Sequence, residues 1–178
     1  GGQDDHGLED APIGNGRAIS RLLAREGAQL AVVDRVLERA QQSVQIVHED
    51  QGRAVAIEAD VREPAQIESM VARAAEALSG LDGIVYNVGI AREMWLANTT
   101  PEGWDFTFSV NLRGVALTLR AALPILADGS SIVLISSTAA LKPGSRFPAY
   151  DSSKAALAGL MRHAAFEGAR RGIRVNVV

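Results

Sequence analysis

Residues 14–34 read GNGRAISRLLAREGAQLAVVD, a glycine-containing turn followed by a helix-like stretch and a short β-branched run. Outward from this stretch, as far as the C-terminus, near-continuous apolar runs alternate with longer segments rich in Ala, Leu and Arg. This alternation is typical of a parallel sheet whose two faces are covered by helices, with right-handed crossovers. The sequence therefore predicts an α/β fold with a doubly wound parallel sheet, that is, a Rossmann-like three-layer α/β/α domain over residues 1–178.

The same pattern places the individual strands and helices. The expected strands are residues 29–34, 54–60, 83–87, 130–136 and 173–178, and the expected helices are residues 17–26, 36–49, 64–78, 101–126 and 150–170. One face of the third helix is expected to be buried, because its apolar residues recur at spacings of three and four. These residues are Ile67, Met70, Val71, Ala74, Ala75 and Leu78. Thr100 is a candidate N-cap of the fourth helix, with Pro101 in its first position.

Both ends of the chain depart from this fold. Residues 1–13 read GGQDDHGLEDAPI, with four acidic side chains and Pro12, where a buried central strand is expected. Buried charges are costly and proline removes a ladder donor, so we expect the first strand to be degenerate. The chain ends at Val178, inside the last expected strand. We therefore expect an incomplete sheet, in a fragment with an aberrant N-terminus and a missing C-terminal part.

Composition excludes several classes of function. Lys and Arg number 18 and Asp and Glu 21, so no basic excess exists to bind nucleic acid. Cysteine is absent, which excludes disulfides, thiolate metal sites and a cysteine nucleophile. His6, His48 and His163 lie far apart and are expected at the surface, not as metal ligands. No apolar run approaches the ~20 residues of a membrane span, and the first ten residues, which are polar and acidic, do not resemble a secretory signal. We expect a cytoplasmic protein.

Gly14-Asn15-Gly16 and Asp34 form a candidate nucleotide site. Glycines at a helix start let backbone N–H groups approach a pyrophosphate, although the same turn can simply begin a helix. Asp34 ends a strand eighteen positions after Gly16, where an acidic residue accepts hydrogen bonds from the adenosine ribose and repels a 2′-phosphate. Asp34 can also cap the following helix, and the two roles can coexist. The site favours NAD over NADP, with Arg35 softening the discrimination.

Tyr150 and Lys154 are candidate catalytic residues, because residues four apart on a helix share a face. A free phenol has a pKa of about 10, and a neighbouring ammonium favours the phenolate that a proton acceptor requires. The pair can equally be ordinary helix surface. Ser136 and Ser137 end an expected strand, where a hydroxyl can polarise a carbonyl oxygen or simply be a polar strand end.

Taken together, these residues resemble the short-chain dehydrogenase/reductase family, and the resemblance runs from about Gly14 to Val178. The family's YxxxK pattern falls on Tyr150 and Lys154, and its serine, thirteen positions earlier, falls on Ser137. The resemblance implies that Asn111 supports the proton path by holding a water that links the lysine to solvent. It also implies cofactor contacts beyond the glycine turn and Asp34. These fall on Asp60, Val61, Asn87, Gly89, Tyr150 and Lys154.

The family resemblance implies an NAD-dependent oxidoreductase that transfers a hydride between NAD(H) and a secondary alcohol or ketone, with Tyr150 as acid and base. Two departures count against it. Tyr86 replaces the first Asn of the family's Asn-Asn-Ala-Gly element, and Glu9 and Asp10 replace its Thr-Gly. The alternative is a non-catalytic nucleotide-binding or scaffold remnant of the same fold.

The resemblance implies a small alcohol or carbonyl compound as substrate, and the sequence does not determine which one. Residues 92–95 and 143–146 are expected to border the cleft, although Met94 and Trp95 can also be simple packing residues. Family members commonly associate through the two long helices, which implies a dimer or a homotetramer. The Ala-rich residues 155–160 suit such close helix contact, or burial against the chain's own sheet.

Overall fold

The structure is a computed structural model that describes residues 13–142 and 144–178. The chain divides into two compact units, residues 1–80 and 81–178, each with its own sheet and helices. The degenerate first strand expected before Gly14 lies, over residues 1–12, outside the described residues. Strand and helix order follows the α/β alternation that the sequence predicts.

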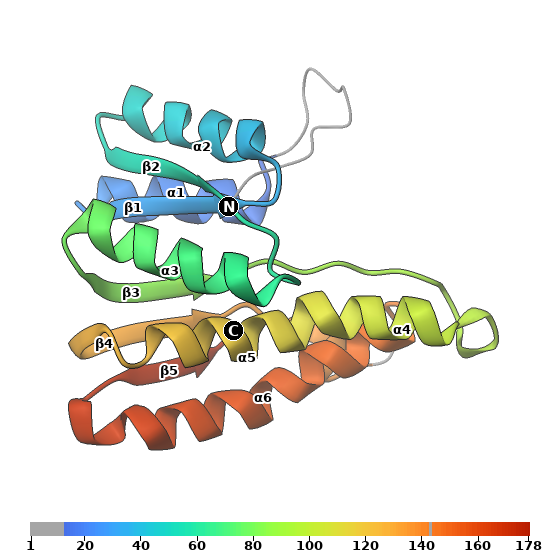
Figure 1. The fold of residues 1–178 in the computed structure, drawn as a ribbon. Helices are drawn as coiled ribbons and strands as arrows, with labels where there is room; N and C mark the ends of the chain where they lie inside the picture. The colour runs from blue at the N-terminus through green and yellow to red at the C-terminus, as the bar shows by residue number, and fades with distance from the viewer. Residues whose placement is uncertain (1–12, 143) are drawn as a thin grey trace. The chain divides into compact units, whose positions relative to one another are not determined.

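The first unit holds a two-stranded parallel sheet and three helices (Figure 1). The strands are β1 (Gln29–Asp34) and β2 (Arg53–Glu58), and the helices are α1 (Asn15–Arg25), α2 (Leu37–Glu49) and α3 (Pro64–Leu78). The strands pair in register from Gln29 with Arg53 to Asp34 with Glu58. The bounds of α3 agree with the prediction. Pro64 is the first residue of the helix, a position where the backbone N–H has no partner within the helix, so a proline there costs no hydrogen bond.

Alternate residues of β1 and β2 face opposite sides of this sheet, as strand geometry requires. On one side of the sheet, four strand residues pack against Ala40 and Val44 of α2: Leu30, Val32, Ala54 and Ala56. Ile57 points to the other side, and α3 contacts both strands. The buried residues of α3 are Ile67, Met70, Val71 and Ala74, which confirms the buried face predicted for this helix. The two apolar faces explain why both strands read as nearly continuous hydrophobic runs.

The second unit holds a three-stranded parallel sheet in the order β3–β4–β5. Its strands are β3 (Leu81–Tyr86), β4 (Leu126–Leu134) and β5 (Arg174–Val177). Its longer helices are α4 (Pro101–Phe108), α5 (Gly114–Ala122) and α6 (Pro148–Gly168), and its short ones are η1 (Leu96–Asn98), η2 (Ser109–Arg113), η3 (Thr138–Ala140) and η4 (Ala169–Arg171). The strand order advances one place at each crossover, so right-handed connections put α5 and α6 on the same face (Figure 1).

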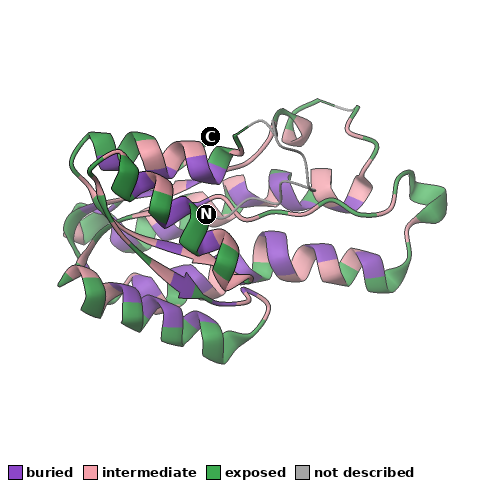
Figure 2. Ribbon diagram, turned by 90° about the horizontal axis from the view of Figure 1, so that it is seen from above, coloured by how far each residue is buried: buried purple, intermediate pink, exposed green. Residues whose placement is uncertain are grey.

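The core of the second unit lies between this sheet and the two helices. Tyr86, Leu134 and Val177 are neighbours in register, as are Ile84, Ile132 and Val175, so both rows face the same way. Ile132 and Leu134 are fully buried. The residues that α5 and α6 bury include Val115, Leu119, Leu157 and Ala164. Buried residues form stripes on one side of the helices (Figure 2), the pattern expected of amphipathic helices that cover a sheet.

The helix predicted over residues 101–126 differs most from the structure. It begins at Pro101 as expected, and the Thr100 hydroxyl accepts a hydrogen bond from the Gly103 amide at 3.0 Å, which confirms the N-cap. However, residues 109–113 form a π-helical turn, and the helix ends at Ala122. Residues 126–129, predicted partly as helix, instead begin β4, because Leu126 pairs with Leu81 across a register shift.

Candidate active site

The ends of β3 and β4 place candidate residues side by side in the second unit. The Ile135 amide donates to the Tyr86 carbonyl at 2.9 Å, which continues the pairing of the strands past their ends. Asn87 and Gly89 follow β3, and Ser136 and Ser137 follow β4. Because the strands are parallel, both loops leave the same edge of the sheet, the edge at which open α/β sheets bind ligands.

Lys154 is a buried cation in the second turn of α6, with 4% of its surface exposed. Its Nζ donates to the Ile135 carbonyl at 2.7 Å, and within the described residues no carboxylate pairs with it. Burial lowers the pKa of Lys154 from 10.5 to about 8, because desolvation disfavours the charged form. A Cβ at Gly89 would lie 3.0 Å from this Nζ, so glycine suits the close approach of the β3 loop.

Tyr150 lies in the first turn of α6, one turn before Lys154, and its side chain is half-buried. The Nζ of Lys154 is 5.8 Å from the centre of the phenol ring. Within residues 13–142 and 144–178, no hydrogen bond engages the Tyr150 hydroxyl. The phenol and the ammonium therefore share one face of α6, as the four-residue spacing predicted, and the phenol oxygen keeps its hydrogen-bonding capacity for a ligand.

The two serines after β4 have different partners. Ser136 Oγ donates to the Lys154 carbonyl at 2.9 Å and so fastens the strand to α6. Ser137 Oγ accepts from the Ala139 amide at 3.1 Å and caps η3, which leaves its hydroxyl hydrogen available to a ligand. Of the two, Ser137 is therefore the one whose hydroxyl can donate to a substrate oxygen.

Asn111 lies in the π-helical turn and is fully buried. Its Oδ1 accepts from the Ile90 amide at 2.9 Å, and its Nδ2 donates to the Ile90 carbonyl at 2.8 Å and to Ser153 Oγ at 3.0 Å. Ser153 Oγ in turn donates to the Tyr150 carbonyl at 2.7 Å. The amide of Asn111 thus joins the loop after β3 to the turn of α6 that carries Tyr150.

The glycine turn lies in the first unit. Gly14 is the N-cap residue of α1, with φ −74° and ψ 154°, and the Ala18 amide donates to its carbonyl at 3.0 Å. No side chain among the described residues caps this end, and the first turn of α1 has no acidic residue. Asn15 is exposed and Gly16 is buried. Among residues 13–142 and 144–178, no side-chain cap and no acidic first-turn residue lies at this helix start, a setting compatible with a phosphate.

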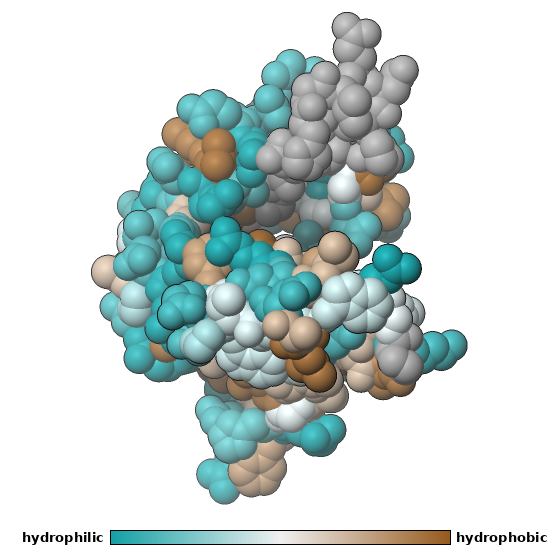
Figure 3. Space-filling model, turned by 90° about the vertical axis from the view of Figure 1, so that its right-hand side faces the viewer, coloured by the Kyte–Doolittle hydropathy of each residue, from teal (hydrophilic) through white to brown (hydrophobic). Residues whose placement is uncertain are grey.

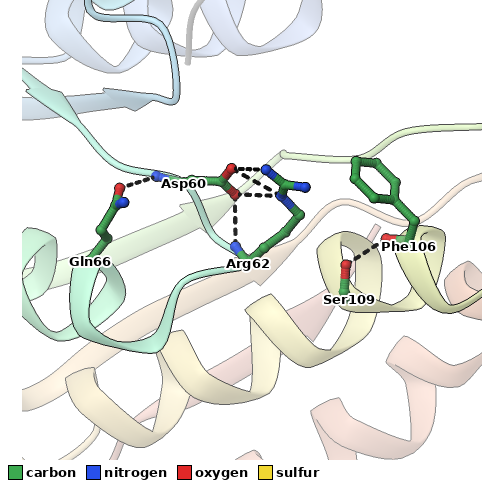
Figure 4. A network of polar contacts seen from close by, with 5 residues as sticks. All are labelled: Asp60, Arg62, Gln66, Phe106 and Ser109. Carbon is green, nitrogen blue, oxygen red and sulfur yellow. Dashed lines mark hydrogen bonds and ion pairs between the residues drawn. The ribbon is translucent and has the colours of Figure 1, made fainter.

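Asp34 is the last residue of β1, and Asp60 lies just after β2. Both carboxylates have local hydrogen-bond partners. Asp34 Oδ1 accepts from the Val36 amide at 3.0 Å, just before α2, so the capping role considered for Asp34 exists. Asp60 accepts from the Arg62 amide and from its guanidinium, and the Asp60 amide donates to Gln66 Oε1 at 2.8 Å (Figure 4). The hydrogen bonds from Arg62 hold the pKa of Asp60 below its usual value. Val61, beside them, is buried.

The loops expected to border the substrate are joined in the second unit. The Trp95 amide donates to the Arg146 carbonyl at 2.8 Å, and the Arg146 guanidinium lies 5.7 Å from the Trp95 ring centre. Met94, Trp95 and Leu96 are exposed. The face of the molecule shown in Figure 3 has apolar side chains among polar ones. Trp95 is therefore not a core packing residue. Pro143 lies outside the described residues.

Three contacts of the second unit had no signal in the sequence pattern. They are the Ser153 link between Asn111 and Tyr150, the Lys154 bond to the Ile135 carbonyl, and a bond from the buried Tyr86 hydroxyl to the Val110 carbonyl at 3.3 Å. Each joins residues at least 19 positions apart, except for the Ser153–Tyr150 step within α6. Sequence reasoning names Asn111, Tyr150 and Lys154 as site residues and Tyr86 as a departure from the family pattern, but it does not predict these partners.

The described residues contain no cluster of three His, Cys, Asp or Glu that could bind a metal ion. His48 bonds the Ala54 carbonyl and His163 pairs with Glu167, while His6 lies outside the described residues. Across the part of the chain that the structure describes, no helix is both long and apolar enough to cross a membrane.

Comparison with known proteins gives consistent matches. A family model described as Enoyl-(Acyl carrier protein) reductase matches residues 12–178. The 2,3-dihydro-2,3-dihydroxybenzoate dehydrogenase of Bacillus subtilis is 35% identical over 96% of this chain and 66% of its own length. A dehydrogenase/reductase structure from Sinorhizobium meliloti is 40% identical with a TM-score of 0.86, covering 90% of this chain and 64% of that one.

A short-chain dehydrogenase from Burkholderia cenocepacia, solved in complex with NADP, is 38% identical with a TM-score of 0.84 and covers 90% of this chain and 66% of that one. The chain thus spans slightly less than two thirds of the length of these relatives. The structural matches confirm the Rossmann-like α/β fold class predicted from the sequence. On these matches and on the α/β order of its elements, the chain belongs to the short-chain dehydrogenase/reductase family of oxidoreductases.

Proposed function

We propose that this protein is an NAD-dependent oxidoreductase that transfers a hydride between NAD(H) and a secondary alcohol or ketone, with Tyr150 as the acid and base. The observation that carries the proposal is the phenol of Tyr150 on the same helix face as the buried Nζ of Lys154, 5.8 Å from the ring centre. Lys154 has no compensating carboxylate among the described residues, so its charge is available to stabilise a phenolate.

In this proposal, Tyr150 removes the hydroxyl proton during oxidation and returns it during reduction. Ser137 donates a hydrogen bond to the reacting oxygen, because Ser136 already binds the Lys154 carbonyl. Asn111 holds the Ile90 backbone and, through Ser153, the turn that carries Tyr150. It supports the proton path by keeping these groups in place. A secondary alcohol or ketone fits because the reaction needs one oxygen between a proton donor and a hydrogen-bond donor.

The residues also fit a dinucleotide. Gly14, Asn15 and Gly16 would hold the pyrophosphate at the start of α1, where no side-chain cap or acidic first turn competes among the described residues. Asp34 would bind the adenosine ribose and disfavour a 2′-phosphate, so we favour NAD over NADP. Asp60 and Val61 would border the adenine, and Asn87, Gly89, Tyr150 and Lys154 would border the nicotinamide end. When bound, the nicotinamide supplies the site that accepts or donates the hydride.

The test is Tyr150→Phe, which removes one oxygen and keeps the ring. We expect turnover of a panel of secondary alcohols to fall about 10³-fold, the range of a lost general base, while NADH fluorescence titration gives an affinity within about twofold of the parent. Ser152→Ala, an exposed change on the same turn, is the matched control and keeps both. Undiminished turnover by the Phe variant would refute the role of Tyr150.

The same titration, read together with turnover, separates the proposal from its alternative, a non-catalytic nucleotide-binding or scaffold remnant of the fold. That alternative was suggested by Glu9 and Asp10, which lie outside the described residues. Saturable binding of NADH at micromolar concentration, tighter than that of NADPH, supports the NAD-dependent enzyme. Absence of binding by either nucleotide would favour the remnant.

The proposal extends to assembly and location. Within the Ala-rich residues 155–160, Leu157 is buried against its own unit, whereas Ala155 and Gly159 are exposed on the opposite side of α6. These small exposed residues suit close contact with a second copy, so a dimer or a homotetramer through α4–α5 and α6 is the expected assembly. The mass in solution tests this expectation. A cytoplasmic location remains a prediction from the sequence.

A further inference from the structure

Tyr86 stands where the family has an asparagine, and the structure gives its hydroxyl a specific partner. The side chain is 7% exposed and lies on the helix-covered side of the sheet. Its hydroxyl donates to the Val110 carbonyl at 3.3 Å, across 24 positions of sequence. A buried tyrosine hydroxyl that binds a helix backbone carbonyl has a function beyond filling space, because phenylalanine would fill the same volume.

The Val110 carbonyl lies in a turn where the ordinary helix pattern is interrupted. In an α-helix the Gly114 amide would donate to the carbonyl four residues back, which is that of Val110. Here the Gly114 amide donates to the Ser109 carbonyl, five residues back, as in a π-turn. The Tyr86 hydroxyl therefore offers a donor to a carbonyl that the π-turn deprives of its usual one. At the start of the turn, the Ser109 hydroxyl donates to the Phe106 carbonyl at 2.6 Å (Figure 4).

The next residue after Val110 is Asn111, whose amide binds both backbone groups of Ile90 and also Ser153. The π-turn determines where this side chain points, because an insertion of one residue rotates all following side chains around the helix. The backbone of Tyr86 reaches the same site by a second route. Its carbonyl accepts from the Ile135 amide, and the Ile135 carbonyl accepts from Lys154 Nζ at 2.7 Å.

We infer that Tyr86 is a positioning residue: its hydroxyl holds the π-turn in the register that aims Asn111 at Ile90 and so sets the groups around Lys154 and Tyr150. The inference rests on the proposed function for its catalytic consequence, but the structural link from Tyr86 to Ile90 stands on its own contacts. It assigns a function to the residue by which this chain departs from the family's Asn-Asn-Ala-Gly element.

The test is Tyr86→Phe, which deletes the hydroxyl and keeps the buried ring. We expect hydrogen exchange of the Ile90 amide to accelerate at least tenfold relative to that of Ile132, a core amide of β4, because the Asn111 acceptor loses its fixed position. In turnover, we expect kcat to fall about tenfold and its pH profile to shift, while KM for the nucleotide stays within twofold. A merely structural hydroxyl would lower stability without moving this profile.

Thr118→Val is the matched control. The Thr118 hydroxyl is also buried and also donates to a helix carbonyl, that of Gly114, but among the described residues it makes no hydrogen bond to Val110 or Asn111. This variant is expected to lose stability comparably and to keep the exchange ratio of Ile90 to Ile132 and the pH profile of kcat. Equal behaviour of the Phe and Val variants in both measurements would overturn the inference.

The two readouts separate this inference from the proposed function. If the parent chain oxidises no secondary alcohol, the proposed function fails, and the exchange ratio of Ile90 to Ile132 still decides the role of Tyr86. If turnover is present and the ratio is unchanged in Tyr86→Phe, the positioning inference fails and the proposed function stands.

Discussion

Two carboxylates of the first unit lie against arginines, whereas the most buried charge of the second unit has no opposite charge beside it among the described residues. Asp50 is held by Arg21 and Arg25, and Asp60 by Arg62. Hydrogen bonds from the arginines lower the pKa of both carboxyls. Lys154 instead donates a hydrogen bond to the Ile135 carbonyl, and burial lowers its pKa to about 8. Paired charges are typical of structural contacts, while a buried charge without an opposite partner marks a candidate functional site.

The largest expected effect comes from removing the uncompensated charge. Lys154→Met keeps most of the side-chain volume and deletes the ammonium. We expect turnover to fall about 10³-fold, because the proposed function needs this ammonium beside the proton-accepting Tyr150. The fall of the Lys154 pKa from 10.5 to about 8 means that burial of its charge costs free energy, so the variant's free energy of unfolding at pH 7 should rise by up to about 3 kcal/mol. The cost of leaving the Ile135 carbonyl without its hydrogen-bond donor reduces this gain.

The pH dependence of stability checks this sign. Between about pH 8 and 10.5 the unfolded Lys154 binds a proton that the folded one has released, so the parent gains stability as the pH rises through that range. The Met variant should show no such gain. Chemical denaturation at pH 7, 8.5 and 10 measures both curves, and parallel curves would show that Lys154 is not desolvated as described.

A smaller effect is expected at the two serines, whose roles the structure separates. Ser137→Ala should lower kcat about 10²-fold with little change in the free energy of unfolding, because it removes one donor to the reacting oxygen. Ser136→Ala should instead lower the unfolding free energy by about 1 kcal/mol, because it deletes the bond to the Lys154 carbonyl. Steady-state kinetics and urea unfolding of both variants test these roles. A loss of kcat in Ser136→Ala together with a loss of stability in Ser137→Ala would mean that the two roles are exchanged.

Sequence reasoning predicted the parts of this molecule that depend on local pattern. The 64–78 helix follows from its apolar spacing and Pro64, and the start of α4 follows from Thr100 and Pro101. The pairing of Tyr150 and Lys154 on one face follows from helix geometry alone. Each of these features is determined within a few residues of sequence, so a single chain is enough to predict it.

Features that depend on contacts between distant segments were not predicted. The π-turn at residues 109–113 has no composition of its own, and residues 126–129 form a strand because Leu126 pairs with Leu81. The links from Asn111 to Ile90 and from Lys154 to Ile135 join loops that only the folded sheet brings together. The pattern indicated which residues are candidates for the chemistry, but their hydrogen-bond partners depend on the fold.

The smallest expected effect tests the paired side of the comparison. Asp60→Asn removes a charge that Arg62 neutralises within two residues, so the loss is expected to be about 1 kcal/mol of unfolding free energy at pH 7. Because the folded pKa of Asp60 lies below its unfolded value, its contribution is present above about pH 4 and is lost as the pH falls through the folded pKa. The variant should therefore lose less stability than the parent between pH 5 and about pH 2. Arg62→Gln is the matched change on the other side of the pair. If either variant loses several kcal/mol of unfolding free energy, this pair is as critical to the fold as a buried ion pair, and the contrast with Lys154 is wrong.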